Sequence, residues 1–185
     1  MTTDSTNIEP ASAQSELGER VDTDTLRFVR RFKASPQRVW HALTTPEGIA
    51  AWLGRPVRIE VHAGGTFEVA MGEEHLMDGR IIACEPGSRL EIDWHETSDG
   101  VSQPYGTQPG DRSCILFELV ASAEGGTVLT FTHRCIQGGE TMIGFGAGWH
   151  AHLERLDAWL SGSAEIDPSA RYAALEPRYR EQLAT

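Results

Sequence analysis

Positive charge is scarce in this chain. Its 185 residues include 16 Lys and Arg against 27 Asp and Glu, which gives a formal net charge of −11. Nucleic acids and anionic lipid surfaces both attract basic proteins, so this composition argues against nucleic acid as a partner and against adsorption to anionic membranes. The N-terminus has neither a basic start nor an apolar run, unlike a secretory signal, and no apolar stretch approaches the length of a membrane span.

The chain also lacks the short motifs that mark common catalytic and metal sites. It contains no GxSxG elbow, no P-loop and no dinucleotide fingerprint. An HExxH motif and a Cys and His quartet are missing as well, and His150 and His152 would point roughly 200° apart on a helix. We therefore expect no metal ion and no cofactor. Catalysis by residues scattered around a cavity would leave no such motif, so it stays open.

Cysteine is rare, and its pattern favours a reducing compartment. The cysteines stand at positions 84, 114 and 135, an odd number without CxxC spacing. Cys84 and Cys114 lie in apolar, strand-like runs, which is typical of small buried hydrophobic residues in an intracellular protein. We expect a cytoplasmic protein without disulfides.

Large apolar residues are sparse in the first part of the chain. Residues 1–24 carry six acidic residues and one arginine, and their large apolar side chains are limited to Ile8, Leu17 and Val21. Such a segment buries too little surface to offset the entropy lost on ordering. We predict that residues 1–24 form a disordered acidic tail.

The last part of the chain, residues 163–185, has a different pattern. Its apolar residues recur at helical spacing: Tyr172, Leu175, Tyr179 and Leu183. Pro177 lies among them and predicts that the helix breaks into two short pieces. This amphipathic tail would dock either on the domain or on a second copy of the chain, so a homodimer is an open alternative.

Residues 25–162 show a regular order of predicted elements. Strand-like alternation at 26–32 precedes two helix starts, each a hydroxyl N-cap before a proline, at Ser35-Pro36 and Thr45-Pro46. Further strands are predicted at 57–61, 66–71, 75–84, 89–95, 114–120 and 127–134. Gly79 is expected to mark a bulge or bend, and residues 96–111 to form a long polar loop. Short turns join most of the other strands, so the sheet should be antiparallel and meandering.

One late helix completes the predicted domain. Trp149, Leu153, Leu156 and Leu160 form a single apolar stripe, and Gly162 marks the helix end. The glycine-rich residues 138–148 precede this stripe and weaken the helix prediction there. The whole pattern predicts an α+β fold in which a curved antiparallel sheet of about six or seven strands wraps on a long C-terminal helix.

This order of elements resembles the helix-grip fold of the START/SRPBCC superfamily, which is also called the Bet v 1-like fold. Within it, the chain is most similar to small bacterial proteins that resemble the C-terminal domain of the activator of Hsp90 ATPase. The matching motifs are Ala34-Ser35-Pro36, Val39-Trp40, Ala42-Leu43-Thr44, Pro46, Trp52, Gly64-Gly65 with Phe67, Gly79, Glu85-Pro86-Gly87 with Leu90, Trp94, Gly126-Thr127, Thr132-His133 and Gly148-Trp149. The resemblance runs over residues 25–162.

The resemblance implies a deep cavity between the sheet and the long helix. Members of the superfamily bind lipids, sterols, polyketides and other hydrophobic molecules, and a few are cyclases or hydrolases. The eukaryotic co-chaperone carries a separate domain ahead of this one that contributes to Hsp90 binding. In this chain, the predicted acidic tail stands in that place.

Strand parity and the helix stripe predict which side chains would line such a cavity. The apolar candidates are Trp52, Phe67, Val69, Ile92, Trp94, Phe117, Phe131, Met142, Trp149 and Leu153. The polar candidates are His133, which would orient a ligand or act as a base, and Asp78, whose facing strand parity leaves undecided. Any of these side chains could instead fill the core, which is the default place of buried apolar residues, and His133 could be a satisfied core histidine.

Three functions are compatible with this pattern. The first is binding of a hydrophobic small molecule (a lipid, a polyketide-like or an aromatic compound) in the cavity. The second is cyclase or hydrolase chemistry in the same cavity, which would require a hydrogen-bonded set such as His133 with Asp78 or Arg80. The third is a co-chaperone-like or regulatory role with a protein partner, Hsp90 among them.

Overall fold

The structure is a computed structural model, and it describes residues 17–71, 75–98 and 113–183. The strands are β1 (Glu19–Asp22), β2 (Thr25–Phe32), β3 (Arg55–Ile59), β4 (Thr66–Ala70), β5 (His75–Glu85), β6 (Arg89–Ser98), β7 (Ser113–Ala121) and β8 (Thr127–Arg134). The helices are α1 (Pro36–Thr44), α2 (Pro46–Trp52), α3 (Gly139–Ser161) and α4 (Pro168–Leu183).

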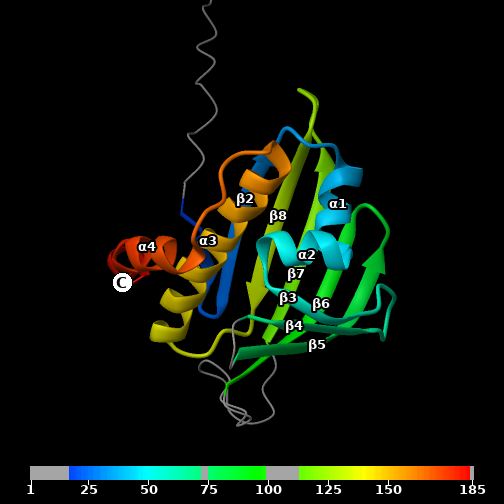
Figure 1. Cartoon of the computed structure of the whole chain (residues 1–185). Helices are drawn as coiled ribbons and strands as arrows, with labels where there is room; N and C mark the ends of the chain where they lie inside the picture. Colours follow the sequence, from blue (N-terminus) through cyan, green and yellow to red (C-terminus); the bar gives the residue numbers. More distant parts are fainter. Residues whose placement is uncertain (1–16, 72–74, 99–112, 184–185) are drawn as a thin grey trace, which may run out of the picture.

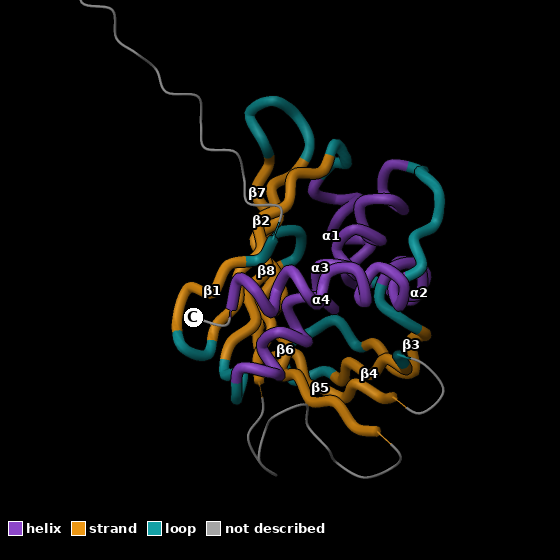
Figure 2. Tube along the Cα trace, turned by 90° about the vertical axis from the view of Figure 1, so that its left-hand side faces the viewer, coloured by secondary structure: helices purple, strands orange, loops and turns teal. Residues whose placement is uncertain are grey.

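Within the described residues, the strands form a single eight-stranded sheet in the order β1-β2-β8-β7-β6-β5-β4-β3. All neighbouring strands are antiparallel. The long helix α3 crosses one face of the sheet, with α1 and α2 beside it (Figure 1), and the sheet curves around the helices (Figure 2). The predicted helix-grip architecture is therefore confirmed, with eight strands rather than six or seven.

Strand β1 is the part of the sheet that sequence patterns missed. It lies within residues 1–24, which were predicted to be a disordered tail, and residues 1–16 of that range lie outside the described residues. All four β1 side chains are exposed, so no apolar alternation announces the strand. Its backbone pairs with β2, and Gly18 just before it donates a hydrogen bond to the Tyr179 hydroxyl at 2.6 Å.

The predicted helix starts are confirmed by their cap geometry. The Ser35 hydroxyl accepts a hydrogen bond from the backbone N–H of Arg38, and Pro36 opens α1. Thr45 does the same for Gly48 at the start of α2. Each cap satisfies one of the N–H groups that a helix start leaves without a partner. At the end of α2, Trp52 is buried, with its ring 6.5 Å from that of His152 in α3.

Helix α3 begins at Gly139, so the glycine-rich residues before Trp149 are helical. Its predicted apolar stripe is buried against the sheet, with Trp149, Leu153, Leu156 and Leu160 all at most 7% exposed. Glycine has a low intrinsic helix propensity, and packing of this stripe against the sheet stabilises the helix in spite of it.

Helix α4 is continuous through Pro177, contrary to the predicted break. Proline costs the helix one hydrogen bond and strains the turn before it, but α4 buries Leu175, Tyr179 and Leu183 on both sides of that position. Gly146 of α3 permits this packing, because a Cβ at that position would come within 2.6 Å of the Tyr179 ring. The C-terminal tail therefore docks on its own domain.

Two predictions about β5 and β6 are corrected. The register shift between these strands lies between Ile81 and Ala83 rather than at Gly79. Gly79 instead permits a close approach, because a Cβ there would lie 2.1 Å from the Asp93 carbonyl oxygen. Strand β6 extends to Ser98, so residues 96–98 of the predicted loop are strand, and 99–111 lie outside the described residues.

Candidate functional site

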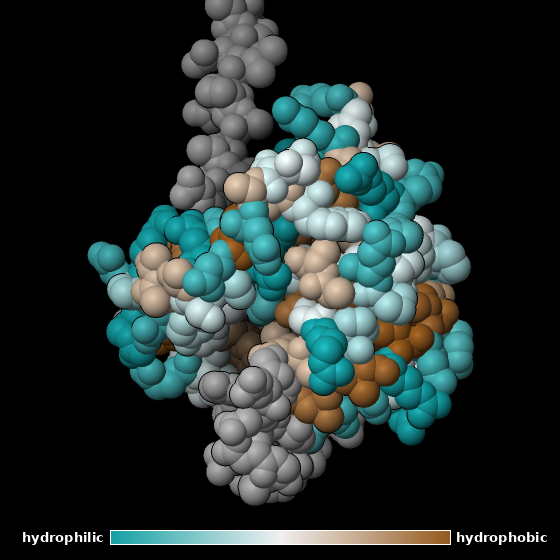
Figure 3. Space-filling view, viewed as in Figure 1, coloured by the Kyte–Doolittle hydropathy of each residue, from teal (hydrophilic) through white to brown (hydrophobic). Residues whose placement is uncertain are grey.

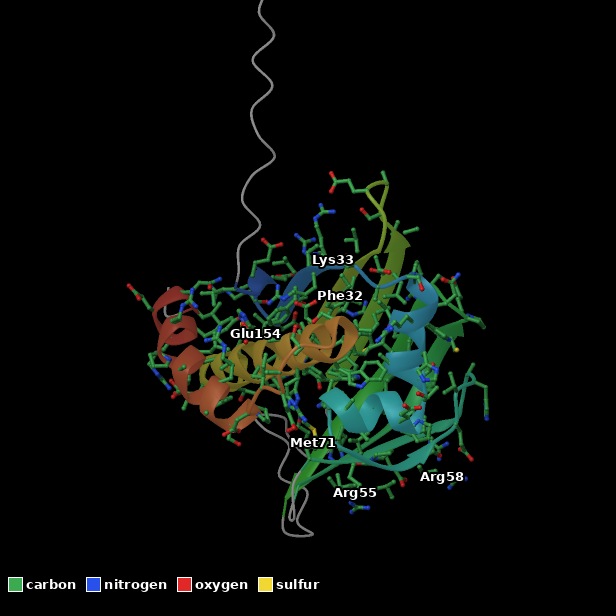
Figure 4. All side chains as sticks on the ribbon, turned by 45° about the horizontal axis from the view of Figure 1, so that its top comes forward. Phe32, Lys33, Arg55, Arg58, Met71 and Glu154 are labelled. Carbon is green, nitrogen blue, oxygen red and sulfur yellow. The ribbon has the colours of Figure 1, made fainter. Side chains whose placement is uncertain are left out.

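A cavity of about 740 Å³ lies between the N-terminal half of α3, the start of α4 and the sheet. Its lining residues are Leu53, Gly54, Arg55, Ala70, Met71, Trp94, Glu96, Thr141, Gly144, Phe145, Gly148, Trp149, Ala151, His152, Arg155, Pro168, Ser169 and Tyr172. Figure 3 shows a recess beside the N-terminal half of α3, with hydrophobic residues at its bottom. In Figure 4, Met71 lies between the helices and the strands, and Arg55 lies further out. This volume is in the range of small-molecule sites.

The face that α3 turns to the cavity explains why space remains there. Thr141, Gly144, Gly148 and Ala151 follow one another at three- and four-residue steps, and all four line the cavity. A Cβ at Gly148 would have no heavy atom within 4 Å, so this helix face is bare. The neighbouring face carries Trp149 into the core. The cavity therefore exists because positions without a side chain, such as Gly148, lie next to large side chains such as Trp149.

Aromatic rings form much of the apolar wall. The rings of Trp94 and Trp149 meet at a centroid distance of 4.8 Å with 61° between their planes. Phe145 lies beyond them with its ring against His133, and Tyr172 closes the wall from α4. The tilted contacts hold the rings in fixed orientations, so the wall is preformed.

The polar side of the cavity is built on α3 and β6. The Trp94 indole donates a hydrogen bond to Glu96 at 2.7 Å, which places a buried carboxylate in the wall. Nδ1 of His152 lies 2.9 Å from the Trp52 carbonyl oxygen, and Nη1 of Arg155 donates to the same oxygen at 3.3 Å. The C-terminal end of α2 therefore fixes two polar side chains of the cavity.

His133 is a satisfied core histidine. It is fully buried, and its Nδ1 accepts a hydrogen bond from the Trp149 indole at 2.9 Å. An indole N–H can only donate, so the proton of the neutral imidazole is on Nε2, which donates to the Ser113 hydroxyl at 2.8 Å. Burial lowers the pKa of His133 to about 3. Both ring nitrogens are thus engaged, and neither is available as a base.

The structure places the other predicted site residues as follows. Trp94 and Trp149 line the cavity. The remaining apolar candidates are all buried in the core without lining it: Trp52, Phe67, Val69, Ile92, Phe117, Phe131, Met142 and Leu153. Asp78 pairs with Glu68 across the β4–β5 ladder and with Nδ1 of His95 at 2.7 Å. Met77, the preceding residue of β5, is fully buried and so marks the inner face of the sheet. Neighbouring strand residues point to opposite faces, so Asp78 points away from the cavity and from His133.

Sequence patterns missed the wall residues that come from loops and from α4. Gly54 has no side chain that a pattern could register, and Tyr172 lies in the predicted tail, whereas Met71 shares the inward parity of Phe67 and Val69 in the predicted strand. The glycine spacing of α3 was the available signal, because Gly144 and Gly148 stand four residues apart on one helical face. Nothing in the sequence announced that His152 rather than His133 faces the cavity.

Among the described residues, no group of His, Cys, Asp and Glu side chains is arranged to hold a metal ion. None of their helices is both long and apolar enough to cross a membrane.

Residues 33–161 match the family model described as activator of Hsp90 ATPase homolog 1-like protein. The chain belongs to this family. The predicted resemblance is thereby confirmed over most of the domain, from just before α1 to the end of α3. Among the curated proteins, none matches the chain.

Solved structures share the fold of this family member. CalU16 from Micromonospora echinospora is 23% identical with a TM-score of 0.66, over 87% of this chain and 89% of that one. DynU16, a putative protein in the dynemicin biosynthetic locus, is 25% identical with a TM-score of 0.65, over 80% of this chain and 51% of that one. The protein encoded by BPP1335 from Bordetella parapertussis is 23% identical with a TM-score of 0.65, over 94% and 96%.

Proposed function

We propose that this protein binds an apolar small molecule, aromatic or polyketide-like, in the cavity between α3, α4 and the sheet. One observation carries the proposal: the cavity of about 740 Å³ has aromatic walls and a helix face on which Gly148 leaves open space. Apolar surface moved from water into such a site gains about 25 cal/mol per Å². The description of DynU16 as part of a dynemicin biosynthetic locus supports this class of ligand.

A steric block at Gly148 tests the proposal. Because a Cβ there meets no heavy atom within 4 Å, Gly148→Leu would project its side chain into the cavity without disturbing the core. Replacing a helical glycine also favours the helix by about 0.5–1 kcal/mol. We expect Gly148→Leu to fold at least as stably as the wild type and to bind pyrene at least tenfold more weakly in a fluorescence titration.

Gly148→Ala is the matched control, since it gains the same helical preference and adds one methyl group. It should retain pyrene binding close to that of the wild type. If Gly148→Leu binds pyrene as well as Gly148→Ala does, the ligand site lies elsewhere. If the wild type binds neither pyrene nor any copurified molecule detectable by native mass spectrometry, the cavity does not serve binding.

The two alternative functions stay predictions. For catalysis, neither predicted partner bonds to His133: Asp78 contacts His95, Arg80 is exposed and donates to the Gly64 carbonyl, and both His133 nitrogens are engaged elsewhere. A co-chaperone role is tested separately, by whether the full chain changes the ATPase rate of Hsp90. A stimulation that persists in Gly148→Leu would point to an outer surface of the domain.

A further inference from the structure

The cavity has one polar corner whose hydrogen-bonding capacity the protein leaves partly unused. It is formed by His152 and Arg155, which lie three residues apart on α3 and both line the cavity. Both also bond to the Trp52 carbonyl oxygen. Since that oxygen can only accept, His152 carries its proton on Nδ1 and leaves a lone pair on Nε2. In the described part of the chain, Nε2 makes no hydrogen bond.

His152 stays in this neutral form near neutral pH. Burial lowers its pKa, and the positive charge of Arg155 acts in the same direction, while the Trp52 carbonyl and Glu96 oppose them. The ring is held edge-on between Trp52 and Trp149, at centroid distances of 6.5 and 6.4 Å. The lone pair of Nε2 is therefore a fixed acceptor beside an aromatic wall.

Arg155, which lines the same cavity and bonds to the same carbonyl oxygen, supplies a donor. Its Nε is the one buried side-chain nitrogen or oxygen among the described residues that has no hydrogen-bond partner. A buried donor left unpaired is unfavourable compared with one that meets an acceptor. Glu165, the ion-pair partner of Arg155 at 3.6 Å, is 86% exposed and touches the other end of the guanidinium. An oxygen admitted to this corner would give Nε the missing partner.

The charges of Arg155 and Glu96 determine which ligand head group fits this corner: a carboxylate, an ammonium or a neutral hydroxyl. Arg155 is positive, and Glu96 brings a carboxylate to the same cavity. A ligand carboxylate would pair with Arg155 but would have no proton for His152 Nε2 and would face Glu96. A ligand ammonium would donate to Nε2 but would face Arg155. A neutral hydroxyl both donates and accepts, so it fits both groups.

We propose that the cavity recognises a hydroxylated aromatic ligand, whose hydroxyl group donates to Nε2 of His152 and accepts from Nε of Arg155. The rings of that ligand would lie against Trp94 and Trp149. This inference rests on the proposed binding function and adds the polar group that would orient the ligand. It assigns to His152 the ligand contact that sequence patterns assigned to His133.

Three probes of one shape test the inference at pH 7: pyrene, 1-hydroxypyrene and 1-pyrenecarboxylate. A neutral hydrogen bond contributes about 0.5–1.5 kcal/mol net, so the wild type should bind 1-hydroxypyrene roughly three- to tenfold more tightly than pyrene. It should also bind 1-hydroxypyrene more tightly than the carboxylate. Tightest binding of the carboxylate would overturn the inference in favour of an anionic head group.

Two variants connect the preference to the corner. His152→Asn retains an amide N–H that can reach the Trp52 carbonyl but lacks the atom at Nε2, and Arg155→Lys retains the charge but lacks the Nε donor. Each should bring the ratio of the 1-hydroxypyrene and pyrene affinities toward one. His62→Asn is the matched control, because His62 is an exposed histidine whose Nδ1 also contacts a carbonyl oxygen, that of Ala63 at 3.1 Å. It should leave the ratio unchanged.

The outcomes separate the two proposals. Equal affinities of the wild type for pyrene and 1-hydroxypyrene would overturn the hydroxyl contact and leave the apolar cavity function standing. A hydroxyl preference that survives in both corner variants would place the contact elsewhere in the cavity. Failure of the wild type to bind either probe would remove the cavity function and this inference together.

Discussion

Single side chains decide how the interior of this protein responds to pH. His133 and His150 are both buried, and both donate and accept hydrogen bonds as neutral rings. Burial lowers the pKa of His133 to about 3. For His150, burial and the charge of Arg30 lower the pKa to about 4, against the opposing pull of Glu154. These histidines therefore stabilise the fold only while they remain uncharged.

This arrangement predicts a loss of stability under mild acid. An unfolded histidine binds a proton below a pH of about 6.5, whereas the folded pKa values of His133 and His150 are lower. The unfolded state therefore binds more protons between pH 6.5 and 4, and stability is complete above pH 6.5 and falls as the pH drops. The free energy of unfolding in urea should decrease by about 1.4 kcal/mol per pH unit for each histidine.

The variant His150→Gln isolates the contribution of His150. Between pH 7.5 and 5.5 the free energy of unfolding of this variant should fall less than that of the wild type. The difference should equal the contribution of one histidine, about 1.4 kcal/mol per pH unit below pH 6.5. The exposed His41 offers the control, because His41→Gln should keep the wild-type slope. Identical slopes for His150→Gln and the wild type would show that His150 does not stay neutral in the fold.

The variant Trp149→Phe removes the hydrogen bond from the Trp149 indole to His133. Trp149→Phe keeps an aromatic ring in the wall but leaves the buried Nδ1 of His133 without its donor. Loss of that partner and of packing should lower the free energy of unfolding by about 1–3 kcal/mol. Trp159→Phe, on the part-buried side of α3, should cost less than 1 kcal/mol. Similar losses for the two variants, measured by urea unfolding, would contradict the assigned network.

At the scale of elements, α4 is the feature that most changes the site. Tyr179 is fully buried and connects three segments, since its hydroxyl accepts from Gly18 and contacts Nδ1 of His150 at 3.0 Å. Arg171 of α4 pairs with Glu154 of α3 at 2.8 Å, and Figure 4 shows Glu154 on the α4 side of α3. This docking brings Pro168 and Tyr172 to the cavity wall.

The proline inside α4 gives a stability prediction that belongs to this scale. Pro177→Ala restores a helical hydrogen bond and relieves the clash with the preceding turn, which is worth about 3 kcal/mol in a helix interior. The greater freedom of alanine in the unfolded chain offsets about 0.4–1 kcal/mol of that. We expect the variant to unfold at a higher temperature than the wild type.

Pro36→Ala is the comparison for this prediction. Pro36 stands at the first position of α1, where no intrahelical hydrogen bond is lost to proline, so its replacement should not stabilise the protein. A melting temperature for Pro177→Ala at or below that of the wild type would show that the ring of Pro177 contributes packing that its exposed position does not suggest.

Across the whole molecule, the sequence predicts the scaffold better than the site. Caps such as Ser35 and Thr45 are local signals, and the stripe on α3 is periodic, so both were read correctly. Strand β1 was missed because its exposed side chains carry no periodic signal, even though it pairs with the next strand along the chain, β2. The docking of α4 depends on Gly146, whose role is visible only beside the Tyr179 ring.

The cavity shows why site residues were harder to predict. The alternation of side chains along the strands correctly predicted which of them point inward, but most of these fill the core. Of the predicted site residues, Trp94 and Trp149 alone line the cavity. The space itself comes from positions without side chains, such as Gly148, which an apolar pattern does not register. His133 and His152 have the same chemistry, and only tertiary contacts decide which of them is engaged and which has a nitrogen to offer.

The central claim is that the space between α3, α4 and the sheet is a ligand site. A crystal structure of the complex with 1-hydroxypyrene tests it most directly. Our account predicts the ring system against Trp94 and Trp149, over the bare face at Gly148, with the hydroxyl oxygen within hydrogen-bond distance of His152 Nε2. A ligand bound on the outer face of the sheet, with the side chains of α3 and α4 collapsed into the cavity, would contradict it.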